Sequence, residues 1–189
     1  EQTMDAYPFP VARIGIIGGG QLGRMMVKAA KRLGCTCVVL DPTPGSPAGQ
    51  VSGHQIVGDY HDAAKLRELV ESTDVTTFDI EDIDAATLIE LQAEGRQIHP
   101  SPSVLSAIQD KLTQKRMLSE AGIATSEFVE VRGDHAKAFA EFGYPLVQKA
   151  RRGGYDGRGV AVMKAPEEFD RHLPVPSYVE RFVEAEKGI

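Results

Sequence analysis

The chain has 189 residues, with 21 Lys and Arg against 27 Asp and Glu, so its formal net charge is −6. Hydrophobic residues make up 42% and charged residues 25%, the balance of a globular protein with one domain or two small ones. The acidic balance argues against a nucleic-acid binder, which needs clustered Lys and Arg to neutralise phosphates. No apolar run approaches the roughly 18 residues of a membrane span, and no apolar signal segment precedes the first predicted strand. We therefore expect a cytoplasmic protein with no nucleic-acid or membrane partner.

Predicted strands and helices alternate through the first half of the chain. Residues 1–12 are expected to form a flexible leader, and the apolar run at 13–18 is typical of a strand buried on both faces. Further strands are predicted at 35–41, 54–60 and 75–82, and helices at 21–34, 61–72 and 85–94. The helical spacing in the first helix predicts that its buried face is formed by Leu22, Met25, Met26, Ala29, Ala30 and Leu33. This alternation predicts a parallel α/β sheet.

The pattern changes near residue 103, where we place a domain boundary. One helix is predicted over 103–122, because Leu105, Ile108, Leu112 and Leu118 follow helical spacing. Strands are predicted at 125–131, 144–150, 160–164 and 178–183, with a helix near 134–141. The predicted fold class is therefore α/β, with a Rossmann-like parallel-sheet domain at 13–102 followed by a mixed α+β unit at 103–189.

The first glycine motif lies between a predicted strand and a predicted helix. Gly18, Gly20 and Gly23 satisfy G-x-G-x-x-G, and Asp41 closes the next strand. Such a turn brings backbone N–H groups at a helix N-terminus close to an anion. By spacing alone the motif fits a dinucleotide site with Asp41 on a ribose hydroxyl, but a tight strand-to-helix turn without a ligand also uses glycine. The motif indicates an anionic or nucleotide-like ligand without naming it.

The second glycine motif connects two predicted strands. Lys149 lies near the end of the first strand, and four glycines follow between 153 and 159. Since a Walker loop must open a helix, this strand–loop–strand motif is of another kind. A glycine hairpin beside a lysine suits a flap over a triphosphate, with backbone N–H groups and a point charge facing the phosphates. Lys111, on the preceding helix, is either a second phosphate contact or an ordinary solvated charge.

No metal site is predicted from the cysteines or histidines. Cys35 and Cys37 stand too close in sequence for a useful disulfide loop, and we interpret them as buried small residues of a reduced protein. The histidines follow no metal-ligand spacing: His54, His61, His99, His135 and His172.

Four segments together resemble the 5-(carboxyamino)imidazole ribonucleotide synthetases, the ATPase part of phosphoribosylaminoimidazole carboxylase. They are the glycine loop at 13–26, the segment QDKLTQK at 109–115, the hairpin KARRGGYDGRG at 149–159 and the strand YVERFV at 178–183. The acidic segment FDIEDI at 78–83 also resembles the family, with Glu81 at its glutamate. The family belongs to the ATP-grasp enzymes of purine biosynthesis.

The resemblance implies roles for individual residues. Catalytic roles are implied for Asp156, Arg158 and Glu81. Substrate contacts to aminoimidazole ribonucleotide are implied for Gly20, Gln21, Leu22, Glu81 and Tyr155. ATP contacts are implied for Lys111, Lys149, Gly153, Gly154, Tyr155, Asp156, Gly157, Arg158, Gly159, Val160, Glu180, Arg181, Phe182, Val183 and Glu186. The family's acidic residue for the ATP ribose falls at Gly188 by direct spacing, with Glu186 two residues earlier.

The resemblance also implies a reaction, cofactors and partners. Bicarbonate and ATP give carboxyphosphate, and the amine of the ribonucleotide takes up the carboxyl group, with ADP and phosphate as the other products. The family's Mg²⁺ ligands are expected beyond residue 189, so residues 13–102 would be a pre-ATP-grasp domain and 103–189 the first part of an ATP-grasp domain. The longer parent is expected to be a homodimer, and this piece alone is not expected to turn over.

Two other functions remain open from the sequence. One is a nicotinamide-dependent oxidoreductase built on the first glycine motif and Asp41, which leaves the second glycine motif unexplained. The other is a non-catalytic folded fragment that binds the ribonucleotide or nothing.

Overall fold

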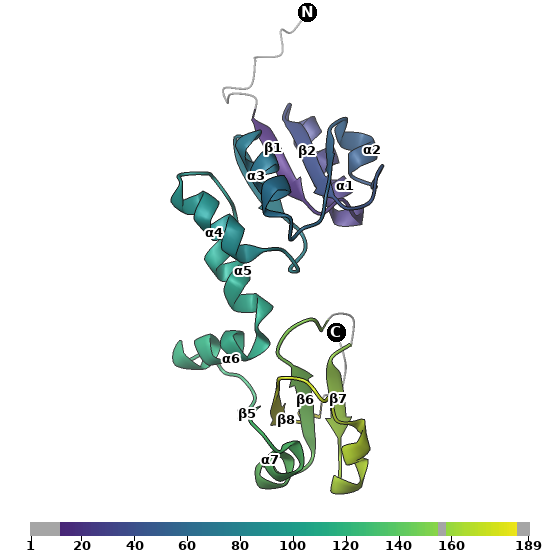
Figure 1. Ribbon diagram of the computed structural model, residues 1–189. Coiled ribbons are helices and arrows are strands. Elements are labelled where there is room, and N and C mark those ends of the chain that lie inside the picture. The colour runs from purple at the N-terminus through teal and green to yellow at the C-terminus, as the bar shows by residue number, and fades with distance from the viewer. Residues whose placement is uncertain (1–11, 155–157, 185–189) are drawn as a thin grey trace, which may run out of the picture. The chain divides into compact units, whose positions relative to one another are not determined.

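The computed structural model describes residues 12–154 and 158–184, and it divides into two compact units, Glu1–Ser106 and Ala107–Ile189 (Figure 1). Each unit has its own sheet, parallel in the first and antiparallel in the second. The predicted fold class is therefore confirmed. The division between the units falls inside a helix, four residues after the predicted boundary at 103.

The first unit is built on a four-stranded parallel sheet. Its strands are β1 (Arg13–Ile17), β2 (Thr36–Asp41), β3 (Gln55–Val57) and β4 (Val75–Phe78), in the order β3-β2-β1-β4. Its helices are α1 (Gln21–Arg32), α2 (Gly49–Ser52), α3 (Ala63–Glu71) and α4 (Ala85–Ala93). Ile16 and Ile17 are both buried although they point to opposite faces, so both faces of the central strand are covered. Cys37 lies in this core as a free thiol, as predicted, whereas the free Cys35 is only half-buried and packs against the core.

The buried face of α1 differs from the predicted one. Leu22, Met25 and Leu33 are 58%, 57% and 62% exposed, whereas the face toward the sheet is formed by Gly23, Val27 and Ala30. A Cβ at Gly23 would lie only 2.2 Å from a backbone carbonyl oxygen, so the helix packs there through a missing side chain. Ala30 is buried as predicted and Met26 packs against the core, so the prediction is wrong at Leu22, Met25 and Leu33. Gly23 is not detected because a glycine gives no hydrophobic signal.

The second unit has a four-stranded antiparallel sheet. Its strands are β5 (Phe128–Val131), β6 (Leu146–Ala150), β7 (Val160–Met163) and β8 (Ser177–Arg181), in the order β5-β8-β6-β7. The helix α7 (His135–Phe142) and the 3-10 segment η1 (Pro166–Arg171) accompany it. Their core contains Phe139, Leu146, Met163 and Val179, each fully buried. The strands β6 and β7 are joined by the predicted glycine hairpin, with Lys149 opposite Val160.

The prediction of a single helix over 103–122 is wrong. The structure has two helices, α5 (Pro102–Gln109) and α6 (Lys111–Glu120), separated by Asp110. Asp110 has an extended backbone, and its Oδ1 accepts hydrogen bonds from the N–H groups of Leu112 at 3.1 Å and Thr113 at 3.2 Å. Asp110 is thus the N-cap of a new helix. Apolar spacing continues across the break, so the periodicity alone does not detect it.

Among the described residues, no helix combines the length and the apolar composition that crossing a membrane requires.

Candidate functional site

The first glycine motif forms a loop that is held by hydrogen bonds to the side chain of Asp41. Gly18 has φ 111°, a conformation that favours glycine. The buried Asp41 carboxylate accepts hydrogen bonds from Gly19 N at 2.7 Å, Thr43 N at 2.8 Å and the Tyr60 hydroxyl at 2.6 Å. Burial, and then the bond to Asp41, raises the pKa of Tyr60. Asp41 is therefore a structural residue of the loop, and its contact with a ribose hydroxyl stays a prediction.

The predicted substrate residues of the first unit gather at one edge of its sheet. Gly20, Gln21 and Leu22 are exposed at the start of α1, directly after the loop. Glu81 is exposed just beyond β4, and β4 pairs with β1 so that their carboxyl ends meet. The positive end of the α1 dipole faces this edge, which suits an anionic group.

Asp79 is a half-buried acid at this edge, with a buried Oδ1, that the sequence did not single out. It follows β4, and a Cβ placed on Gly18 would lie within 1.8 Å of its Oδ1. Burial raises its pKa, and Oδ1 has no hydrogen-bond partner among the described residues. Gly18 is thus required both by its backbone conformation and by its contact with this carboxyl group.

The second unit contains a cavity of about 430 Å³ beside the glycine hairpin. Four basic side chains take part in its lining, which suits an anionic ligand. The lining residues that the sequence predicted as ATP contacts are Lys111, Lys149, Gly154, Arg158, Gly159 and Val160. The lining residues that it did not predict are Gln114, Lys115, Leu118, Thr125 and Tyr178. Burial raises the pKa of Tyr178 to about 12, so this phenol stays neutral.

Lys111 joins α6 to the glycine hairpin. It is the first residue of the helix, and its backbone N–H donates to the carbonyl oxygen of Arg151 at 2.8 Å. Its side chain reaches the hairpin itself, where Nζ donates to the carbonyl oxygen of Gly154. The solvated-charge interpretation of Lys111 is therefore replaced by a half-buried contact at the cavity wall.

Glu180 is a buried carboxylate between two lysines of the cavity. It is 7% exposed, and it pairs with Lys115 Nζ at 2.6 Å and with Lys149 Nζ, while the Ser126 hydroxyl donates to it at 3.0 Å. Burial raises the pKa of Glu180, but the bonds from Lys115 and Lys149 outweigh it, so the pKa lies below its usual range. Lys115 was missed by the sequence reasoning, although it lies one helical turn after Lys111 and so shares its face.

The remaining predicted ATP residues do not line this cavity. The Arg181 side chain pairs with Glu127 at 3.0 Å and stacks 4.5 Å from the Phe142 ring centroid, and Val183 is 69% exposed. Phe182 follows β8 without a place in the lining. Gly153 lines another cavity, of about 760 Å³, together with Arg151, Arg152 and the segment 173–176. The predictions for Tyr155, Asp156, Gly157 and Glu186, and the position Gly188, lie outside the described residues.

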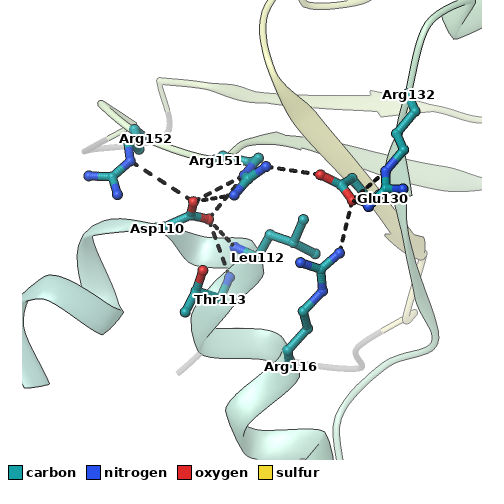
Figure 2. A network of polar contacts seen from close by, with 8 residues as sticks. All are labelled: Asp110, Leu112, Thr113, Arg116, Glu130, Arg132, Arg151 and Arg152. Carbon is teal, nitrogen blue, oxygen red and sulfur yellow. Dashed lines mark hydrogen bonds and ion pairs between the residues drawn. The ribbon is translucent and has the colours of Figure 1, made fainter.

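A network of ion pairs and hydrogen bonds in the second unit links Asp110, Arg151 and Glu130 (Figure 2). Arg151 donates from Nε to both carboxylate oxygens of Asp110, at 3.2 and 3.1 Å, and from Nη1 to Glu130 Oε1 at 2.9 Å. Glu130 also accepts from Arg116 at 2.9 Å and from Arg132. Hydrogen bonds from Arg132 hold the pKa of Glu130 below its usual range. Within the described ranges, no group of three or more His, Cys, Asp or Glu is arranged to hold a metal ion.

Together, a parallel unit with a glycine loop and an antiparallel unit with a lysine-lined cavity under a glycine hairpin define an ATP-grasp type of protein. Residues 11–109 match the ribonucleotide synthetase preATP-grasp domain, and residues 116–189 match the ATP-grasp domain. The chain belongs to the ribonucleotide synthetase preATP-grasp family.

Its relatives include N5-carboxyaminoimidazole ribonucleotide synthases and phosphoribosylaminoimidazole carboxylases. The chain is 37% identical to the Brucella melitensis enzyme over 188 residues, covering 95% of this chain and 52% of that protein. It resembles the solved Thermotoga maritima synthetase with TM-score 0.87 and 47% identity, covering 93% of this chain and 47% of that one. The Aspergillus clavatus enzyme in complex with ADP and 5-aminoimidazole ribonucleotide matches with TM-score 0.82 and 32% identity, over 93% and 48%. The chain thus spans about half the length of these relatives, and none of the comparisons supports the oxidoreductase alternative.

Proposed function

We propose that this chain takes part in the ATP-dependent carboxylation of 5-aminoimidazole ribonucleotide, the activity named by its relatives. The observation that carries this proposal is the cavity of about 430 Å³ in which Lys111, Lys115 and Lys149 meet the glycine hairpin. A triphosphate is the ligand that such a group of cations and backbone N–H groups fits best. Residues 13–102 then act as the pre-ATP-grasp domain and 103–189 as the first part of the ATP-grasp domain.

In the nucleotide site, Lys111 and Lys149 contact the phosphates, and the flap at 154–160 covers them. Lys149 already lies beside Glu180, so it needs only a change of partner to reach a phosphate. The segment 180–183 meets the adenine through backbone groups. This fits the side chain of Arg181, which is occupied by Glu127 and Phe142. The ribose contact is assigned to Glu186.

In the substrate site, Gly20, Gln21 and Leu22 bind the ribonucleotide at the start of α1. This assignment is supported by the open space at Gly20, where a Cβ would meet no atom within 4 Å. Glu81, Tyr155, Asp156 and Arg158 face the aminoimidazole and the bicarbonate-derived intermediate. Support for this ligand comes from the Aspergillus clavatus relative, which is described in complex with ADP and the same ribonucleotide.

The reaction has two steps. A bicarbonate oxygen bonds to the γ-phosphorus as the bond to the β–γ bridging oxygen breaks, so ADP leaves and carboxyphosphate remains. The amine nitrogen then bonds to the carboxyl carbon, phosphate leaves, and the nitrogen loses a proton to give the N-carboxy product. Cationic side chains are needed because an anion attacks an anion. Mg²⁺ would add further positive charge at the phosphates. We further propose a cytoplasmic homodimer.

Calorimetry with Mg-ATP and with the ribonucleotide, each titrated separately into this chain, tests the proposal. Lys149→Met should weaken ATP binding about 10- to 100-fold, the effect of losing one charge-assisted contact. Lys137→Met is the matched control, because that lysine is 73% exposed on α7. A chain that binds neither ligand, or a Lys149→Met variant that binds ATP as well as the control, would contradict the assignment.

A further inference from the structure

Asp110 is a buried charged residue for which the proposed chemistry gives no role. It is 5% exposed, and it lies between α5 and α6, where the helical conformation is interrupted. Capping a helix requires only a side-chain oxygen, which a neutral Asn or Ser supplies as well. A buried carboxylate carries a large desolvation cost unless a cation compensates it. The charge of Asp110 therefore calls for an explanation beyond capping.

Arg151 supplies that compensating cation from a segment 41 residues away in sequence. Its guanidinium lies against the Asp110 carboxylate, bonding to both oxygens, as Figure 2 shows. Burial raises the pKa of Asp110, but the bonds from Arg151 and the Thr113 N–H outweigh it, so the pKa lies below its usual range. Glu130 holds the opposite side of the same guanidinium at 2.9 Å. Arg151 is thus fixed between two carboxylates.

The backbone next to this ion pair makes a second connection between the same two segments. The N–H of Lys111 donates to the carbonyl oxygen of Arg151 at 2.8 Å, and the N–H of Arg151 donates to the carbonyl oxygen of Pro176 at 3.0 Å. Two adjacent residues, 110 and 111, are therefore both bonded to Arg151, one through side chains and one through the main chain. Such a closed pair of contacts fixes both the position and the direction of the first turn of α6.

This geometry matters because of what Lys111 does with its side chain. A lysine has four rotatable bonds and a single charge, so its reach is set by where its backbone is held. Here the backbone is held at the root of the hairpin, and Nζ reaches the hairpin at Gly154. Without the ion pair, the helix start would keep its cap but lose its side-chain connection to the hairpin.

We propose that Asp110 and Arg151 are positioning residues that hold Lys111 against the glycine hairpin for binding the triphosphate of ATP. This inference rests on the proposed function. Neither residue contacts the nucleotide in this scheme, and both act through Lys111.

A double-mutant cycle tests the inference by calorimetry of this chain with Mg-ATP. Asp110→Asn keeps the N-cap and removes the charge, and it should weaken binding about tenfold in the wild-type background. In a Lys111→Met background the same change should alter affinity less than about twofold, because the residue being positioned is gone. Lys137→Met, at a 73% exposed lysine of α7 outside this network, is the matched control and should leave affinity unchanged.

The outcomes separate this inference from the function on which it rests. Equal losses from Asp110→Asn in both backgrounds would mean a general loosening of the unit and would overturn it. Unchanged binding by Asp110→Asn, with the wild type binding ATP, would overturn it while the nucleotide site stands. A wild-type chain that binds no Mg-ATP would overturn both. If Asp110→Asn fails to fold, Arg151→Lys replaces it in the cycle, because it keeps a cation beside Asp110 without the two-pronged geometry.

Discussion

The bracing of the glycine loop by Asp41 leads to a quantitative prediction for Asp41→Asn. In the wild type, Oδ2 accepts from Gly19 N and the Tyr60 hydroxyl, and Oδ1 accepts from Thr43 N. An Asn can keep its oxygen toward the first two donors, but its NH₂ group then faces the third. One hydrogen bond is lost, and the other two no longer have a charged acceptor. Together these changes cost about 3 kcal/mol of local stability. Tyr60→Phe removes a single bond and should cost about 1 kcal/mol.

Hydrogen exchange followed by mass spectrometry can localise this effect to β1 and β2, where the amides are protected by the sheet. Exchange there should accelerate by roughly 100-fold in Asp41→Asn and by no more than about tenfold in Tyr60→Phe. Exchange in β6 and β8 of the second unit should stay unchanged. The reasoning would be refuted if Asp41→Asn exchanged within twofold of the wild type. It would also be refuted if NAD bound the wild type and not the variant, which is the result that a dinucleotide site predicts.

Two further predictions concern stability. Gly23→Ala should destabilise the first unit by about 1–2 kcal/mol in thermal unfolding, because overpacking against the Gly18 carbonyl, where a Cβ would lie 2.2 Å away, exceeds the helix-propensity gain. Gly20→Ser should leave the stability almost unchanged, because a Cβ at Gly20 meets open space and serine is a good N-cap residue. Because the pKa values of Asp110 and Glu180 are lowered on folding, the unfolded chain binds more protons in acid. The second unit should therefore lose stability as the pH falls below about 5, with a shallower loss in Asp110→Asn and Glu180→Gln; equal slopes in wild type and variants would contradict this.

The sequence predicts the sheets well because their signals are local. Short apolar runs with β-branched residues mark β1, β2 and β4, and the two glycine motifs mark the turns that follow or join strands. Lys111 and Lys149 both line one cavity, while their contacts to ATP stay a prediction. These features depend on residues that are close in the chain, or on a motif that carries its own structural context.

Most of the missed features depend on contacts that the periodicity does not show. Asp110 caps α6 locally and also pairs with Arg151, 41 residues further on, and Asp41 accepts a hydrogen bond from Tyr60, 19 residues further on. The buried face of α1 includes Gly23, which can pack closely because it has no side chain. Lys115 shows its importance only through Glu180, which comes from β8. Periodicity and spacing contain no information about such tertiary contacts.

The pairing of Lys149 with Glu180 has a consequence for the selectivity of the cavity. Both cations that face the hairpin already hold oxygen atoms of the chain itself, Lys149 at Glu180 and Lys111 at Gly154. A ligand must therefore replace internal acceptors, and Lys115 remains to neutralise the carboxylate that Lys149 leaves. A single chloride ion makes weaker interactions with the lysines than the internal contacts that it would replace, whereas a polyphosphate provides several acceptor oxygens at once. We expect ordinary salt to compete poorly for this cavity, so that a chain of net charge −6 can hold an anion without a surrounding field of positive charge.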